Sequence, residues 1–298
     1  MRKNILLAFL FLVSIFLLAS CGGNQQENDA GGGGNGETNK ENKGKVSIGL
    51  NNWAENVAVS NLWKVLLEDK GYEVELSSME KAPVWTGIAQ GDLDIAPEVW
   101  LPITDEPLYE EYKDDIELGE TWYEGTGLGL AVPEYMDIAS IEELNDKKSE
   151  FKLEKIVGID AGASLMGLTR NAIDEYSLDY DLIESSETAM LSELDKAYQN
   201  KEPIVVTMWN PHWAFSEYKI KYLEDPKKVY GEADDIYFMT RKGFKDDFPE
   251  VVEWMNNWKM DDDSLGELMA IGQEKEDPIA AAKEWIKKNQ DLVNEWMK

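Results

Sequence analysis

Very few side chains in this sequence are suited to catalysis. The chain has one histidine, His212, in the stretch TMWNPHW, and one cysteine, Cys21. Nucleophilic catalysis of the serine or cysteine type generally needs a histidine base, and zinc sites draw on histidine and cysteine. The acidic runs YEEYKDD and KMDDDSLGE are typical of solvated surfaces, and the second lacks the spacing of a calcium loop. We therefore predict no catalytic residue, no metal site, no cofactor and no enzymatic activity, and we expect His212 to pack or hydrogen-bond within its turn.

Three tryptophans at the ends of predicted strands indicate a different kind of site. Trp53 follows KVSIGLNN, Trp100 ends LDIAPEVW and Trp209 ends PIVVTMW. Aromatic faces attract a quaternary ammonium group, which has no N–H to donate, by roughly 0.5–2 kcal/mol per face. The three indoles are candidates for a cage around such a cation, although each would also serve as a lid on the edge of its sheet. Most other tryptophans are expected in the core, notably Trp254, Trp258, Trp285 and Trp296.

Strands alternate with helices along the body of the chain. This alternation predicts α/β domains with largely parallel sheets, whose ligands bind beyond the carboxyl ends of the strands. The stretches GLGLAVP and ADDIYFMTRKGF resemble two crossings between lobes. We predict a first lobe of residues 45–130 and 238–298, a second lobe of residues 131–237, and a cleft between them.

The N-terminus has the pattern of an exported lipoprotein. Arg2 and Lys3 precede an apolar run, which predicts a signal peptide over residues 1–20. Cys21 follows LAS in an arrangement that resembles a bacterial lipobox, in which the thiol receives a diacylglycerol; an incidental cysteine is the alternative. Residues 21–44 are rich in Gly, Asn and Glu and predict a flexible tether. The body is thus expected at the outer face of the cytoplasmic membrane, attached only by its lipid.

The charge of the chain limits its partners. With 59 acidic and 29 basic residues, the formal net charge is −30. Such a surface repels nucleic acid and anionic lipid headgroups, so neither is expected as a partner. A cationic or zwitterionic small molecule is favoured instead.

Five stretches carry a family resemblance: NNWAENVAVSNLWK, GDLDIAPEVWLP, GIDAGASLMGLT, SSETAMLSELDKAY and EPIVVTMWNPHWAF. Together they resemble the glycine betaine/proline betaine substrate-binding proteins of ABC importers, over about residues 45–298. The resemblance implies an α/β, type II-like periplasmic-binding-protein fold with a hinged interdomain cleft. It implies a monomer that delivers a quaternary ammonium osmolyte to an ABC permease and its ATPase. It also implies that Trp53, Trp100 and Trp209 form the cage.

The resemblance further implies that backbone amides near Ser164 and Leu165 hold the carboxylate of a betaine. The sequence is compatible with this, because Ser164 is placed to cap a helix that begins at Leu165, whose free N–H groups would form an anion site. An ordinary strand-to-helix turn accounts for the same stretch.

One position departs from the family pattern. Where the family commonly has WLPTTH, with a histidine that helps to hold the carboxylate, this chain has WLPITD, with Asp105. Either a betaine binds through the helix N-terminus alone, more weakly, or the pocket prefers a ligand such as choline, whose hydroxyl Asp105 could accept. A carnitine-preferring receptor, and a lipoprotein that senses osmolytes without a transport role, are further alternatives.

Overall fold

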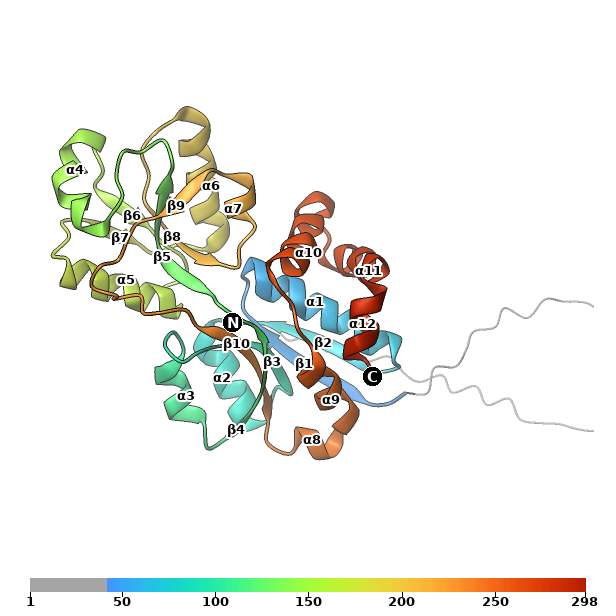
Figure 1. The fold of residues 1–298 in the computed structure, drawn as a ribbon. Coiled ribbons are helices and arrows are strands. Elements are labelled where there is room, and N and C mark those ends of the chain that lie inside the picture. The colour runs from blue at the N-terminus through green and yellow to red at the C-terminus, as the bar shows by residue number, and fades with distance from the viewer. Residues whose placement is uncertain (1–41) are drawn as a thin grey trace, which may run out of the picture. The chain divides into compact units, whose positions relative to one another are not determined.

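The computed structural model describes residues 42–298, which form two α/β lobes (Figure 1). The predicted signal peptide, Cys21 and nearly all of the predicted tether lie outside the described residues. Among the residues that are described, no helix is long and apolar enough to cross a membrane.

The first lobe is built on a five-stranded sheet in the order β2-β1-β3-β10-β4. β1 pairs in parallel with β2 and β3, whereas β10 runs antiparallel to β3 and β4. Four of the six residues of β1 are buried, as expected for a strand covered on both faces. The strands are β1 (Lys45–Leu50), β2 (Glu73–Ser78), β3 (Ile95–Leu101), β4 (Ile116–Tyr123) and β10 (Asp235–Arg241).

The second lobe repeats this arrangement in the order β7-β6-β8-β5-β9. β6 pairs in parallel with β7 and β8, and β5 runs antiparallel to β8 and β9. In both sheets the strand next to the edge comes from a crossing between the lobes, which matches the type II-like arrangement that was predicted. The strands are β5 (Gly127–Pro133), β6 (Lys155–Val157), β7 (Asp181–Ile183), β8 (Val206–Asn210) and β9 (Ile220–Tyr222).

Helices flank the first sheet, and the C-terminal ones pack on this lobe, as expected from the sequence. α1 contacts α10 and α11, and α9 contacts β4. Trp258 stacks on Trp122 at 4.1 Å between ring centroids, and Trp285 stacks on Trp296 at 5.8 Å. The helices of this lobe are α1 (Ala54–Asp69), α2 (Lys81–Gln90), α3 (Glu106–Tyr112), α8 (Phe244–Asp247), α9 (Pro249–Asn257), α10 (Asp262–Lys275), α11 (Pro278–Lys288) and α12 (Gln290–Trp296).

The helices of the second lobe are shorter on average, and the longest of them, α6, begins at a side-chain cap. Ser186 caps α6 by accepting a hydrogen bond from Ala189 N–H, as the sequence SSET suggests. The helices are η1 (Ile141–Glu143), α4 (Leu144–Phe151), α5 (Ser164–Glu175), α6 (Glu187–Asn200) and α7 (Ala214–Glu217).

The lobes are joined by the segments before β5 and before β10. All of β5 belongs to the second sheet and all of β10 to the first, whereas the sequence placed the lobe boundaries at 130/131 and 237/238, inside these two strands. We therefore propose that the chain changes lobe at residues 124–126 and 233–234, because a strand that is paired along its length moves with its sheet.

Candidate functional site

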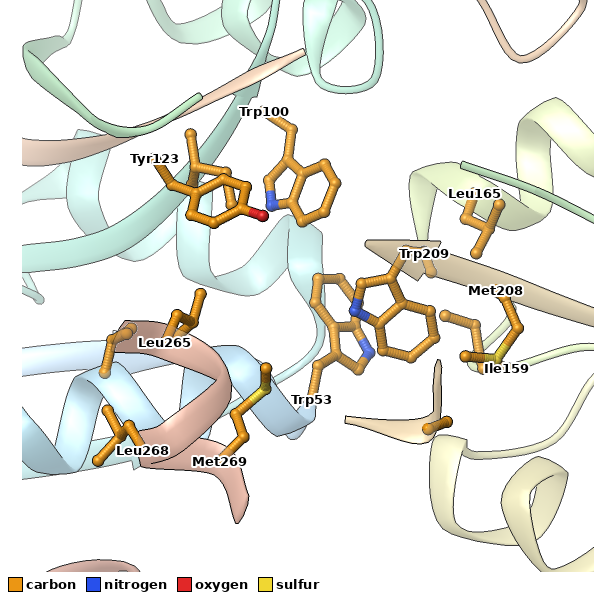
Figure 2. Close-up of a cluster of buried hydrophobic side chains, with 14 of the residues drawn as sticks. Trp53, Trp100, Tyr123, Ile159, Leu165, Met208, Trp209, Leu265, Leu268 and Met269 are labelled. Atoms are coloured by element: carbon orange, nitrogen blue, oxygen red, sulfur yellow. The ribbon is translucent and has the colours of Figure 1, made fainter. Parts of the chain in front are cut away.

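The three tryptophans singled out in the sequence line one cavity between the lobes (Figure 2). Trp53, Trp100 and Trp209 are 9%, 4% and 3% exposed. The cavity has a volume of about 30 Å³ and is completed by apolar and polar side chains from both lobes: Glu55, Lys81, Thr104, Leu128, Ile159, Ala163, Ser164 and Leu165.

Strand ends place each indole at the cavity. Trp53 occupies the N-cap of α1 directly after β1, Trp100 is the sixth residue of β3, and Trp209 is the fourth residue of β8. Two residues after Trp100 and after Trp209 the chain has a cis proline, Pro102 and Pro211 respectively. The two lobes thus present their tryptophans through the same local backbone pattern.

Two of the indoles also bind the opposite lobe. Trp53 Nε1 of the first lobe donates to Asp160 Oδ2 of the second at 3.2 Å. Trp209 Nε1 of the second lobe donates to Glu55 Oε2 of the first at 2.8 Å. The edges of these rings are therefore fixed by carboxyl groups, which leaves the aromatic faces to line the cavity.

Asp105 lies beside the cavity rather than among the residues that line it. Its side chain is fully buried, and its Oδ2 is 2.7 Å from Lys81 Nζ, whose side chain is 4% exposed. The N–H of Trp100 donates to the same oxygen at 2.9 Å, and Ser164 Oγ donates to Oδ1 at 3.0 Å. An ammonium group and two neutral donors thus compensate the Asp105 carboxylate.

The start of α5 differs in detail from the sequence prediction. The helix begins at Ser164 and its N-cap is Ala163, with no side-chain cap, so the prediction that Ser164 caps a helix beginning at Leu165 is wrong. The reason is that Ser164 Oγ is taken by Asp105 of the other lobe. Within residues 42–298, the N–H groups of Ser164 and Leu165 donate to no protein acceptor, which is the state that an anion-binding helix N-terminus requires.

His212 supports Trp209, and its packing within the turn is confirmed. Its ring meets that of Trp209 edge-on with 4.6 Å between centroids, and Nδ1 accepts from Ala214 N–H at 3.0 Å. Since Nδ1 accepts, Nε2 carries the proton and donates to Glu187 Oε1 at 3.1 Å. The other oxygen of Glu187 accepts from Ala54 N–H at 3.0 Å, so this carboxylate joins α6 to the N-terminus of α1 in the first lobe.

Buried acids surround the first turn of α1. Burial raises the pKa of Glu55 well above its ordinary value, and the carboxyls of Glu98 and Glu187 raise it further. Burial also raises the pKa of Glu98 to about 8, although Lys81 acts in the opposite direction. No cluster of three or more His, Cys, Asp or Glu side chains suited to a metal ion occurs in the described part of the chain.

Sequence reasoning did not identify Glu55, Lys81 or Thr104 as lining residues. Glu55 follows Trp53 by two positions, and Thr104 directly precedes Asp105. Closeness in sequence to a predicted site residue could therefore have indicated both. Lys81 opens α2 in the stretch MEKAPVW and has no such signal.

Two α/β lobes with matching strand orders and an aromatic cavity between them define a two-lobed substrate-binding protein. The match to a family model covers residues 44–288, and the chain belongs to this family, the substrate-binding domains of ABC-type glycine betaine transport systems. It is a family of transport proteins, not of enzymes.

Individual relatives agree with this membership. The glycine betaine/carnitine transport binding protein GbuC of Listeria monocytogenes is 46% identical over 144 residues, which are 47% of this chain and 48% of the relative, so the match spans about half of its length. The lactococcal OpuAC structure, closed and complexed with glycine betaine, has a TM-score of 0.80 at 32% identity and covers 85% of this chain and 99% of its own. The structure of ProX, a glycine betaine/L-proline-binding protein from Borrelia burgdorferi, has a TM-score of 0.81 at 35% identity and covers 85% and 97%.

Proposed function

We propose that this protein captures glycine betaine, or a closely similar quaternary ammonium osmolyte, for an ABC importer. The observation that carries the proposal is the cavity lined by Trp53, Trp100 and Trp209, contributed by both lobes. Indole faces replace the water around a trimethylammonium group and attract its diffuse positive charge. GbuC is named for glycine betaine and carnitine, and OpuAC was crystallised with glycine betaine, which supports the same ligand class here.

The polar side of the cavity suits a carboxylate. Ser164 and Leu165 offer free N–H groups at the start of α5, and Lys81 and Thr104 line the cavity beside them. Thr104 Oγ1 is buried and has no partner within residues 42–298. A betaine carboxylate would find backbone donors, a hydroxyl and a nearby ammonium group there.

The surroundings of Asp105 favour a betaine over choline. A free Asp105 carboxylate would repel a betaine and accept the choline hydroxyl, but this carboxylate is fully buried and compensated by Lys81. Carnitine carries both a trimethylammonium group and a carboxylate, so it stays within the proposed ligand class.

The proposed transport step is closure of the lobes around the ligand. Trp53 and Trp100 belong to the first lobe, and Trp209 and the start of α5 belong to the second, so a bound ligand contacts both and favours the closed form. The closed form would then dock on the permease, whose ATPase drives uptake. We place the protein outside the cytoplasm as a monomer anchored through lipidated Cys21.

Isothermal titration calorimetry with glycine betaine, proline betaine, carnitine and choline tests the proposal. We expect the carboxylate-bearing ligands to bind more tightly than choline. Trp209→Leu keeps an apolar side chain but removes an aromatic face, and should weaken glycine betaine binding by about 2- to 30-fold. Trp254→Phe, on α9 outside the cavity, is the matched control and should leave affinity unchanged. Absence of binding for all four ligands would disprove the proposed function.

A further inference from the structure

Glu55 is a buried acid in the cavity whose hydrogen-bonding capacity is only half used. Its side chain is fully buried and it lines the same cavity as the three tryptophans. Trp209 Nε1 donates to Oε2 at 2.8 Å, whereas Oε1 has no hydrogen-bond partner within residues 42–298. A buried carboxyl oxygen without a partner is costly, so this group invites an explanation by a ligand.

The surroundings of Glu55 favour its neutral, protonated form. Burial raises the pKa of Glu55 well above its ordinary value, and the acids Glu98 on β3 and Glu187 on α6 raise it further, against the opposing hydrogen bond from Trp209. Lys81 lines the same cavity, but its ammonium group is 2.7 Å from Asp105. This cation is therefore already paired.

We propose that Glu55 is the counter-ion of the ligand's quaternary ammonium group and loses its proton when the ligand binds. Indole faces provide a quadrupole but no net charge, and an ammonium group enclosed with Glu55 lowers the free energy of the carboxylate form. In this step the O–H bond of Glu55 breaks and the proton passes to the solvent, one per ligand bound. This inference rests on the proposed function.

Because ligand binding is coupled to proton release from Glu55, the affinity for the ligand should depend on pH in one direction. Affinity should rise with pH until the pH exceeds the pKa of Glu55 in the ligand-free protein, and should be constant above it. At pH values between the two pKa values of Glu55, with and without ligand, binding should release about one proton.

Calorimetric titration with glycine betaine in two buffers of different ionisation enthalpy measures this proton. Measured over a range of pH, the wild-type protein should release up to about one proton per ligand, with the largest release between the two pKa values of Glu55. Glu55→Gln should release almost none and bind glycine betaine at least about tenfold more weakly. Glu98→Gln is the matched control, because Glu98 is a buried acid of the same cluster that does not line the cavity. This variant should still release a proton, in a pH range shifted downward because Glu98 no longer raises the pKa of Glu55. If Glu98→Gln abolished proton release and Glu55→Gln retained it, the assignment to Glu55 would be overturned.

Binding of a second, uncharged-headgroup ligand distinguishes a counter-ion role of Glu55 from a role in holding Trp209 alone. The carboxylate tert-butylacetate has the shape of glycine betaine with carbon in place of the charged nitrogen. Glu55→Gln should weaken glycine betaine but not tert-butylacetate; equal weakening of both would show a purely structural role and overturn the proposal. Wild-type binding of glycine betaine without proton release would also overturn it. Failure of every quaternary ammonium ligand to bind would instead disprove the proposed function itself.

Discussion

Removal of both members of the Lys81–Asp105 ion pair should destabilise the protein less than the sum of the two single removals. The two groups are 2.7 Å apart and 4% and 0% exposed. At an effective dielectric constant of about 20 their attraction is about 6 kcal/mol, and desolvation, at several kcal/mol per ion, offsets much of it. Asp105→Asn leaves a buried ammonium without its counter-charge and should lower the free energy of unfolding by about 3–5 kcal/mol. Lys81→Met should cost less, because Trp100 N–H and Ser164 Oγ still donate to the carboxylate.

The double variant Lys81→Met/Asp105→Asn provides the decisive comparison. It removes both charges together and should recover about 3 kcal/mol relative to the sum of the two single variants. Urea unfolding of the ligand-free protein at neutral pH, followed by tryptophan fluorescence, gives all four free energies. If the double variant loses the full sum, the two groups do not stabilise each other, and the explanation of how this chain accommodates Asp105 is wrong.

Three further predictions concern other buried polar groups. Burial raises the pKa of Glu98 from 4.5 to about 8, so between these pH values the folded state retains a proton that the unfolded state has lost. The free energy of unfolding should therefore fall as the pH rises from 4.5 to about 8. Urea unfolding of Glu98→Gln should not show this fall. Glu187→Gln weakens the acceptor shared by Ala54 N–H and His212, which joins the two lobes. The ligand-free variant should therefore be more open, with a larger radius of gyration in small-angle scattering than wild type. An unchanged radius would contradict a role of Glu187 in closure of the lobes. Thr104→Val should weaken glycine betaine by about 0.5–1.5 kcal/mol in calorimetric titrations and leave choline unaffected, whereas equal losses would exclude a contact with the carboxylate.

The placement of the three tryptophans at one cavity was predictable in part, because the end of a strand can be recognised locally and lies at a known edge of the sheet. Trp53, Trp100 and Trp209 each follow or end a recognisable apolar strand, and such ends gather at one edge of a sheet. The α/β class was predictable for a similar reason, since alternating strands and helices allow few arrangements. The rule for the sheet edge therefore accounts for Trp53 and Trp100, whereas their meeting with Trp209 on β8 depends on the packing of the two lobes.

The charged residues of the site were not predictable in the same way. In a chain with 59 acidic residues, Glu55 looks like any solvated acid, and only the approach of Trp209 from the other lobe shows that it is buried. Lys81 is likewise a common residue at the start of a helix until Asp105 is placed beside it. Burial of a charge depends on its partner, and these partners are remote in sequence. The misplaced start of α5 has the same origin, because Ser164 bonds to the other lobe instead of to its own backbone.

The position of β10 determines the order in which the lobes can be completed during folding. β10 lies between β3 and β4, although the whole second lobe separates it from them along the chain. The second sheet, from β5 to β9, is made from one continuous segment and needs no later residue. Until residue 241 has emerged, β3 is paired with β1 alone and β4 has no partner strand among the described residues, so both keep an unpaired edge during synthesis and export. For an exported chain this topology delays completion of the first sheet until residue 241 of 298 has been delivered. The slow, long-range pairing of β10 is therefore expected to limit the folding rate.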